Sequence, residues 1–247
     1  MRSRVPLREY DWPVARAHGH SIDEYLEVIY FLVAPIGEYQ PVGVTAIPAR
    51  VADMLGVSRT AVGEMLKRLT SEGLLEPGGG EMRLTAAGAE RAEQVVRRHR
   101  VIERLLTDFM GYSAAEAHDQ ADLLGEGFTD DMVERMYERL GRPHRCPHGW
   151  PVAPQDERDE NPSLLLLADL EEGEEGEIVR LVEHDGDLLH WFYDEGLTPG
   201  TAFVVRDVRP AAGHVRVALA EGEAGSDRVI AEKAARGLLI RRADSPS

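Results

Sequence analysis

Residues His99 to Glu126, HRVIERLLTDFMGYSAAEAHDQADLLGE, contain two runs in which His, Asp and Glu recur at every fourth position. His99 and Glu103 form the first run, and after a glycine break His118, Asp122 and Glu126 form the second. Residues four apart share one face of a helix, so the stretch predicts two helices that each carry an imidazole and carboxylates on one stripe. Such ligands suit a first-row divalent metal ion, and the alternative is a solvated face of ion pairs.

The composition limits the class of protein. With 43% apolar residues, the 247-residue chain can build hydrophobic cores. Its single cysteine, Cys146, cannot form a disulfide within the chain, which fits a reducing compartment. The N-terminus lacks the apolar segment of a signal peptide, and no run approaches about 18 apolar residues. We therefore expect a cytoplasmic protein without a membrane partner.

The net charge of −16 is unevenly distributed. Residues 1–104 contain 14 basic and 14 acidic residues, whereas the remainder contains 14 basic and 30 acidic residues. The overall acidity argues against nucleic-acid binding. An electroneutral N-terminal region can nevertheless present a local basic face, so DNA binding by that region stays open.

The first predicted helix is IDEYLEVIYFLV, after residues 1–19, which lack periodicity and are expected to form a flexible extension. Ser21, followed three positions later by Glu24, is the signature of a capping box at the start of this helix. Glu24 and Glu27 lie on its polar side, where side chains of this type are ordinarily solvated.

The next segment predicts a winged helix-turn-helix. Pro48 lies in the first turn of a short helix, Gly56 makes a tight turn, and Ser58 caps a second helix, RTAVGEMLKRLTSEG. The following LLEPGGGEMRLT predicts a β-hairpin wing. We expect the second helix to enter the major groove of double-stranded DNA, the alternative being a winged helix used for protein contacts. The expected DNA-binding residues are Ser58, Arg59, Thr60, Gly63, Glu64, Lys67 and Arg68.

A long helix starting at Thr85 connects the predicted winged helix-turn-helix to the stretch His99 to Glu126, and two more helices follow. Their apolar stripes exceed what one small helical unit can bury, so we expect a homodimer. From residue 163 the pattern changes to several short strands, EGEIVRLVE, TAFVVRDV, HVRVALA and GLLIRR, which predict a small SH3-like barrel. The fold class is thus mainly α with a small β part.

The motifs YLEVIY, VADMLGVSRTAVGEMLKRLTSEGL, RRHRVIERLL, AHDQAD and CPHGWPV, in this order, resemble the diphtheria toxin repressor and manganese transport regulator family. The resemblance implies a metal-dependent transcriptional repressor rather than an enzyme. Its manganese-type pattern implies a metal site formed by Glu24, Glu27, His99, Asp122 and Glu126. Its iron-type pattern implies an ancillary site formed by His99, Glu103 and His118.

The segment from LADLEEGEEGEIVRL to LLHWFYDEGLTPGTAFVV resembles the ferrous-transport-A-type domain of the same repressors. In the family this domain can lend ligands to the ancillary site. The candidates here are His184, Asp185 and Asp187, and a polar turn is the alternative.

The chain departs from the family at the end of the primary site, which in the family is a Glu-His pair. An ungapped comparison puts Gly125 and Glu126 in these places, and a one-residue shift puts Glu126 and Gly127 there, so the histidine is absent either way. The alternative function is therefore a winged-helix regulator whose degraded metal site has given way to another ligand. The places that hold Met and Cys in iron-type members are occupied by Glu24 and Asp122, whose hard oxygens favour Mn²⁺ over Fe²⁺. A metal-dependent hydrolase is disfavoured because no HExxH motif is present.

CPHGWPV, with Cys146, His148 and the preceding His144, invites a zinc site, but it does not have zinc-finger spacing and is interpreted as a structural turn. VAPQDERDENPS is interpreted as an acidic linker. The sequence predicts a Mn²⁺- or Fe²⁺-activated homodimer that represses genes of metal homeostasis. Its expected divisions are 1–19 (extension), 20–85 (winged helix-turn-helix), 86–150 (helical metal-binding and dimerisation domain), 151–162 (linker) and 163–243 (SH3-like domain).

Overall fold

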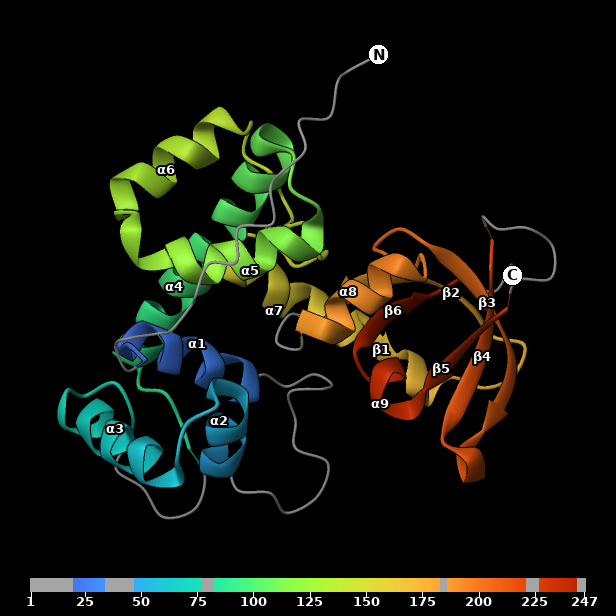
Figure 1. The fold of residues 1–247 in the computed structure, drawn as a ribbon, viewed down its shortest axis with the longest axis horizontal. Coiled ribbons are helices and arrows are strands. Elements are labelled where there is room, and N and C mark those ends of the chain that lie inside the picture. Colours follow the sequence, from blue (N-terminus) through green and yellow to red (C-terminus); the bar gives the residue numbers. More distant parts are fainter. Residues whose placement is uncertain (1–19, 34–46, 77–81, 183–185, 221–226, 244–247) are drawn as a thin grey trace, which may run out of the picture.

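The computed structural model describes residues 20–33, 47–76, 82–182, 186–220 and 227–243. A group of helices makes up the N-terminal part, and an antiparallel sheet with two short helices makes up the C-terminal part (Figure 1). The predicted extension over residues 1–19 lies outside the described residues, as does the loop between the first two helices.

The first three helices are α1 (Ile22–Val33), α2 (Ile47–Leu55) and α3 (Arg59–Ser71). Ser58 caps α3 by accepting a hydrogen bond from the backbone amide of Ala61. Gly56, with φ of 63°, makes the turn between α2 and α3, a conformation that glycine adopts without steric cost. The helices close around one hydrophobic core that includes Leu26, Ile29, Val51, Val62 and Leu69.

The segment predicted to form the wing follows α3, and its described residues contain one antiparallel bridge. Leu75 and Leu84 form an isolated antiparallel bridge, and the tip at 77–81 lies outside the described residues. The segment leads into α4 (Ala86–Leu105). Gly88 of α4 is required here, because a Cβ at this position would lie 1.9 Å from the carbonyl oxygen of Leu74.

The helix α4 continues as a π-helical turn, Leu106–Met110, and ends at Gly111, whose φ is 78°. It is followed by α5 (Ala114–Leu124), a 3-10 turn Gly125–Gly127 and α6 (Asp130–Arg139). Ser113 and Glu116 form a complete capping box at the start of α5. Both α1 and α5 pack against α4, so α4 brings the two helices together.

Residues 151–162, which the sequence predicts as an acidic linker, are partly helical. They contain α7 (Pro154–Glu160), followed by a 3-10 turn Asn161–Ser163. Glu157 of α7 is only 2% exposed and pairs with the fully buried Arg100. The acidic composition suggested a solvated segment because the arginines that neutralise these carboxylates lie far away in the sequence.

The C-terminal part is a six-stranded antiparallel sheet of order β1-β6-β2-β3-β4-β5. The strands are β1 (Leu165–Leu166), β2 (Glu175–Leu181), β3 (Ala202–Arg209), β4 (His214–Leu219), β5 (Arg228–Ala231) and β6 (Leu238–Arg242). Two helices, α8 (Gly186–Asp194) and α9 (Glu232–Ala235), accompany the sheet. The four longer strands match the predicted segments, whereas β1 and β5 were too short for their alternation to be recognised.

Over the described ranges, no helix has both the length and the apolar character needed to cross a lipid bilayer.

Candidate metal centre

His99 is the centre of the site because its two ring nitrogens face different sets of ligands. The ring lies between α1, α4 and α5, and its residue is 7% exposed. Its Nδ1 is 3.3 Å from Oδ1 of Asp122 on α5 and 3.7 Å from Oε1 of Glu27 on α1. We call Glu27, His99 and Asp122 the carboxylate pocket. These residues are 95 positions apart at their extremes, and the packing of α1 and α5 on α4 brings them together.

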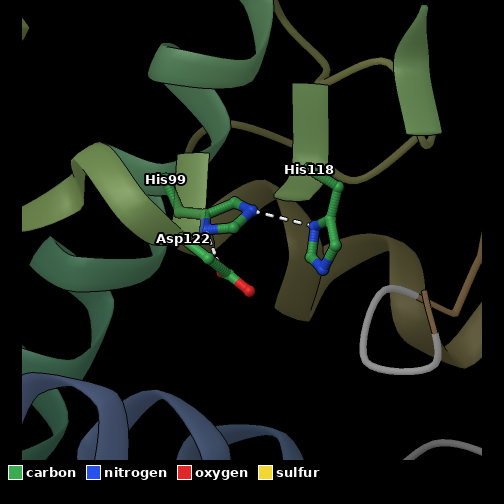
Figure 2. A group of neighbouring side chains, drawn as sticks. All are labelled: His99, His118 and Asp122. Carbon is green, nitrogen blue, oxygen red and sulfur yellow. Dashed lines mark hydrogen bonds and ion pairs between the residues drawn. The ribbon is translucent and has the colours of Figure 1, made fainter. Parts of the chain in front are cut away.

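The other nitrogen of His99, Nε2, faces the interior. It lies 2.9 Å from Oε1 of Glu103. It also lies 3.0 Å from Nδ1 of His118, an interaction that a dashed line marks in Figure 2. One donor atom from each of His99, His118 and Asp122 lies within 4.8 Å of the others. The helical spacing of four thus places imidazoles and carboxylates together.

A second group of ligands lies behind Glu103. Its members are Glu103, Cys146 and His148, whose donor atoms also lie within 4.8 Å of one another, and we call it the thiol pocket. All three residues are buried. Nε2 of His148 is 3.1 Å from the carbonyl oxygen of Ala114, which can only accept, so this nitrogen carries the proton. That leaves Nδ1, 3.1 Å from Oε1 of Glu103, as the nitrogen available for a metal ion.

The buried charges shift the pKa values of this cluster. Burial opposes the charged form of His99, but the carboxylate of Glu103 outweighs it and holds the pKa of His99 well above its usual value. Burial likewise works against the Glu103 carboxylate, and the nearby His148 and His99 nevertheless hold its pKa well below the usual value. The pKa of His118 is raised, because its hydrogen bond to Glu103 overcomes the effect of burial.

One atom in the cluster indicates that it suits a cation. Oε2 of Glu103 is buried and has no hydrogen-bond partner among the described residues. A buried carboxylate oxygen without a partner costs about 1–3 kcal/mol or more, so its presence needs a reason. A divalent ion bound by Glu103, Cys146 and His148 would satisfy it, and this donor set fits a metal ion that accepts nitrogen and sulfur ligands.

Glu24 has a local role in the structure. Its Oε2 accepts a hydrogen bond from the amide of Ser21 at 2.7 Å, while Oγ of Ser21 accepts from the amide of Glu24 at 3.2 Å. These reciprocal bonds form the predicted capping box. The same Oε2 lies 3.2 Å from Nδ1 of His20. Whether Glu24 is also a metal ligand stays a prediction.

The structure gives no metal-site contact for the other predicted ligands among the residues that it describes. The side chain of Glu126 lies outside what the structure describes, as do His184 and Asp185. Asp187 is in the first turn of α8 rather than before the helix, and within the described parts of the chain it makes no ion pair or side-chain hydrogen bond. The carbonyl oxygen of Gly125 faces Nη1 of Arg98 at 3.5 Å.

The expected DNA-binding residues lie on one helix and face away from the core. Ser58, Arg59 and Thr60 are exposed at the start of α3, and Glu64, Lys67 and Arg68 are exposed further along, with Gly63 partly buried. The buried residues of α3 are Val62 and Leu69. Lys67 pairs with Glu64 at 2.9 Å, and Arg68 pairs with Glu72 at 2.9 Å.

The sequence interpretation weighed Cys146 and His148, together with His144, as zinc ligands and favoured a structural turn. Two His and one Cys this close together do not match the spacing of a zinc finger. The missing signal was the partner: Glu103, one turn after His99 on α4, supplies the third donor from a distant part of the chain.

Known proteins share both halves of this architecture. Residues 85–153 match the iron dependent repressor, metal binding and dimerisation domain, and residues 165–242 match the FeoA domain. The iron-dependent repressor IdeR of Mycobacterium leprae is 31% identical over 215 residues, covering 79% of this chain and 90% of that protein. The diphtheria toxin repressor of Corynebacterium glutamicum is 32% identical over 188 residues, covering 72% and 79% respectively.

Solved structures agree. A manganese-dependent transcriptional repressor in complex with manganese has a TM-score of 0.75 at 26% identity, covering 90% of this chain and all of that chain. The IdeR of T. acidophilum has a TM-score of 0.74 at 26% identity, covering 92% of this chain and all of that one. The predicted fold class and family are therefore confirmed. The chain belongs to the diphtheria toxin repressor and iron-dependent repressor family of metal-dependent transcriptional repressors, which are not enzymes.

Proposed function

We propose that this repressor is activated by Mn²⁺, with Fe²⁺ as the second candidate, and that it binds operator DNA as a homodimer to control genes of metal homeostasis. The observation that carries the proposal is the meeting of Glu27, His99 and Asp122 at one imidazole nitrogen. Glu27 comes from α1, which belongs to the core of the helix-turn-helix, whereas Asp122 comes from α5.

This arrangement links ligand binding to the position of the DNA reader. The Glu27 and Asp122 carboxylates repel each other when no cation lies between them. A bound dication supplies the positive charge that allows them to approach. Because α1 packs against α2 in the same core as α3, drawing Glu27 toward His99 fixes the orientation of α3 relative to the rest of the protein.

The metal preference follows from the ligand types. The carboxylate pocket offers oxygens and one imidazole nitrogen, which suit Mn²⁺ and, less selectively, Fe²⁺. The thiol pocket differs because Cys146 contributes sulfur, so it would accept softer ions such as Zn²⁺. His184, Asp185 and Asp187 remain candidates for ancillary ligands from the FeoA domain.

A homodimer would place two α3 helices on two half-sites of an operator. The support is a group of exposed apolar side chains on the helices that follow α4: Phe109, Met110, Leu123, Leu124 and Met132. Arg59 at the start of α3 is suited to base or phosphate contacts, and Lys67 and Arg68 to phosphates.

The test measures metal binding and DNA binding on the same variants. DNA duplexes would be selected from a random library with the Mn²⁺-loaded wild-type protein and then used in gel-shift assays with Mn²⁺, Fe²⁺, Zn²⁺ or chelator. We expect Asp122→Asn to weaken Mn²⁺ binding at least about tenfold and to reduce Mn²⁺-stimulated DNA binding accordingly. Asp131→Asn, on the exposed face of α6, is the matched control and should behave as wild type.

DNA binding that is indifferent to chelator would instead support the winged-helix regulator with a degraded metal site. Retention of Zn²⁺ alone, with no response of DNA binding to Mn²⁺, would contradict the proposed metal.

A further inference from the structure

Trp150 lies where three parts of the chain meet. It is 2% exposed, and its indole Nε1 donates a hydrogen bond of 2.6 Å to the carbonyl oxygen of Leu181 at the end of β2. Phe31 of α1 meets the indole edge-on, with ring centroids 6.1 Å apart and an interplanar angle of 70°. Phe31 belongs to the hydrophobic cluster of the FeoA domain, whereas most other buried residues of α1 belong to the helix-turn-helix core.

Two buried arginines also contact this indole. The guanidinium carbon of Arg100 on α4 is 5.2 Å from the ring centroid, and that of Arg180 on β2 is 4.9 Å from it. Both arginines are 0% exposed. Cations over the face of a tryptophan ring are stabilised more strongly when water is excluded, as it is here.

The helix α7 supplies the opposite charges. Glu157 of α7 receives Nη1 of Arg100 at 2.8 Å, while Glu160 receives Nε of Arg180 at 3.1 Å. Asn161 receives Nη1 of Arg180 at 2.7 Å. Arg180 belongs to the FeoA domain, whereas Glu160 and Asn161 precede it in the chain. Displacing the FeoA domain would therefore leave the buried Arg180 without these partners.

The arrangement reaches the metal centre on both α1 and α4. Phe31 is one helical turn beyond Glu27, so the two side chains project from the same side of α1. Arg100 directly follows His99 on α4. The helix α1 is therefore held at two neighbouring points, by Glu27 near His99 and by Phe31 against Trp150.

We infer that Trp150 is a positioning residue through which the FeoA domain holds the C-terminal half of α1 against α4, with or without metal. Metal binding then acts on a helix that is already held at one end. The FeoA domain therefore contributes to the response of α1 to metal.

Hydrogen exchange of the metal-free full-length protein tests this inference without using DNA. In Trp150→Leu we expect the amides of α1 to exchange about five- to tenfold faster than in wild type, while those of α3 change little. Trp150→Phe keeps an aromatic contact but loses the indole donor, so a smaller acceleration in α1 is expected. Glu93→Gln is the control, because it breaks an exposed ion pair between α4 and α7 without touching the indole.

A second readout rests on the proposed function. In Trp150→Phe, affinity for the selected duplex should fall about threefold while Mn²⁺ affinity stays within about twofold of wild type. Wild-type exchange rates in α1 of Trp150→Phe would overturn the inference, and Trp150→Phe decides the matter if Trp150→Leu does not fold. Absence of metal-dependent DNA binding in the wild-type protein would refute the proposed function and leave the exchange result standing.

Discussion

One carboxylate oxygen of Glu103 lies close to three imidazoles of the metal centre. Its Oε1 lies 2.9 Å from Nε2 of His99, 3.0 Å from Nδ1 of His118 and 3.1 Å from Nδ1 of His148. In the metal-free protein, protonated imidazoles can neutralise the negative charge of the fully buried Glu103 carboxylate, as a metal ion would. Protons and metal ions therefore compete for the same nitrogens.

This competition predicts how the stability of the metal-free protein depends on pH. The raised pKa of His99 contributes stability that is complete below its ordinary pKa of about 6.5 and is lost as the pH rises through the folded-state value. The lowered pKa of Glu103 contributes stability that is present above about 4.5 and is lost as the pH falls through the folded-state value. The pair should thus stabilise the protein most between about pH 4.5 and 6.5. Urea unfolding with chelator present, at several pH values, measures this dependence.

Glu103→Gln provides the comparison, because glutamine preserves the shape of the side chain and removes its charge. We expect this variant to lose the stabilisation that the His99–Glu103 pair provides. The decrease in the free energy of unfolding that the pair causes above about pH 6.5 should therefore be absent. A wild-type profile in the variant would show that the pair does not control the pH dependence. Mn²⁺ affinity of the wild type should rise with pH, because the imidazoles must release their protons to bind metal.

At the scale of single elements, local sequence predicted the helices well. The predicted capping residues Ser21, Ser58 and Thr85 mark the starts of α1, α3 and α4, because a cap depends only on residues within one turn. The burial of α7, by contrast, could not be predicted from local sequence. The burial of α7 depends on Arg100 and Arg180, which lie 57 and 23 residues from Glu157, and no local pattern reveals such partners.

The capping box of α5 has a measurable consequence, because α5 carries both His118 and Asp122. Ser113 accepts the amide of Glu116 and is itself bonded to the Glu116 carboxylate. We expect Ser113→Ala to lower the free energy of unfolding by about 0.5–2 kcal/mol, measured by urea denaturation with chelator present. Ser71→Ala is the control, because Ser71 lies at the C-terminal end of α3 and its hydroxyl donates to the carbonyl of Arg68 rather than capping a helix start. A loss of comparable size in this variant would contradict the capping argument.

At the scale of the whole molecule, the sequence predicted which halves the chain contains but not how they meet. The candidate ligands on α4 and α5 could be found from a spacing of four, since a helix fixes the geometry between them. Glu27, Cys146 and His148 come close to His99 and Glu103 from other segments, so their proximity depends on tertiary packing. The Trp150 contacts likewise combine α1, α4 and β2, and no periodicity in any one of these elements marks them.

The exposed apolar residues yield a prediction about assembly. Phe109 is 67% exposed and Leu123 is 48% exposed, on consecutive helical segments of a region that matches a dimerisation domain. Apolar surface of this kind favours burial against a second copy. We expect Leu123→Glu to shift the protein from dimer to monomer in analytical ultracentrifugation, because a carboxylate would be buried without a partner in the interface.

Val229 gives the matched control, since it is an apolar side chain that is 59% exposed on β5 in the FeoA domain. Val229→Glu should leave the dimer intact. If both variants remain dimeric, the interface does not use α5; if both become monomeric, the FeoA domain contributes to it. Under the proposed function, a Leu123→Glu monomer should also bind a two-half-site duplex far more weakly than the wild type, because the two α3 helices would no longer be joined. Its Mn²⁺ affinity should change little, since Glu27, His99 and Asp122 all come from one chain.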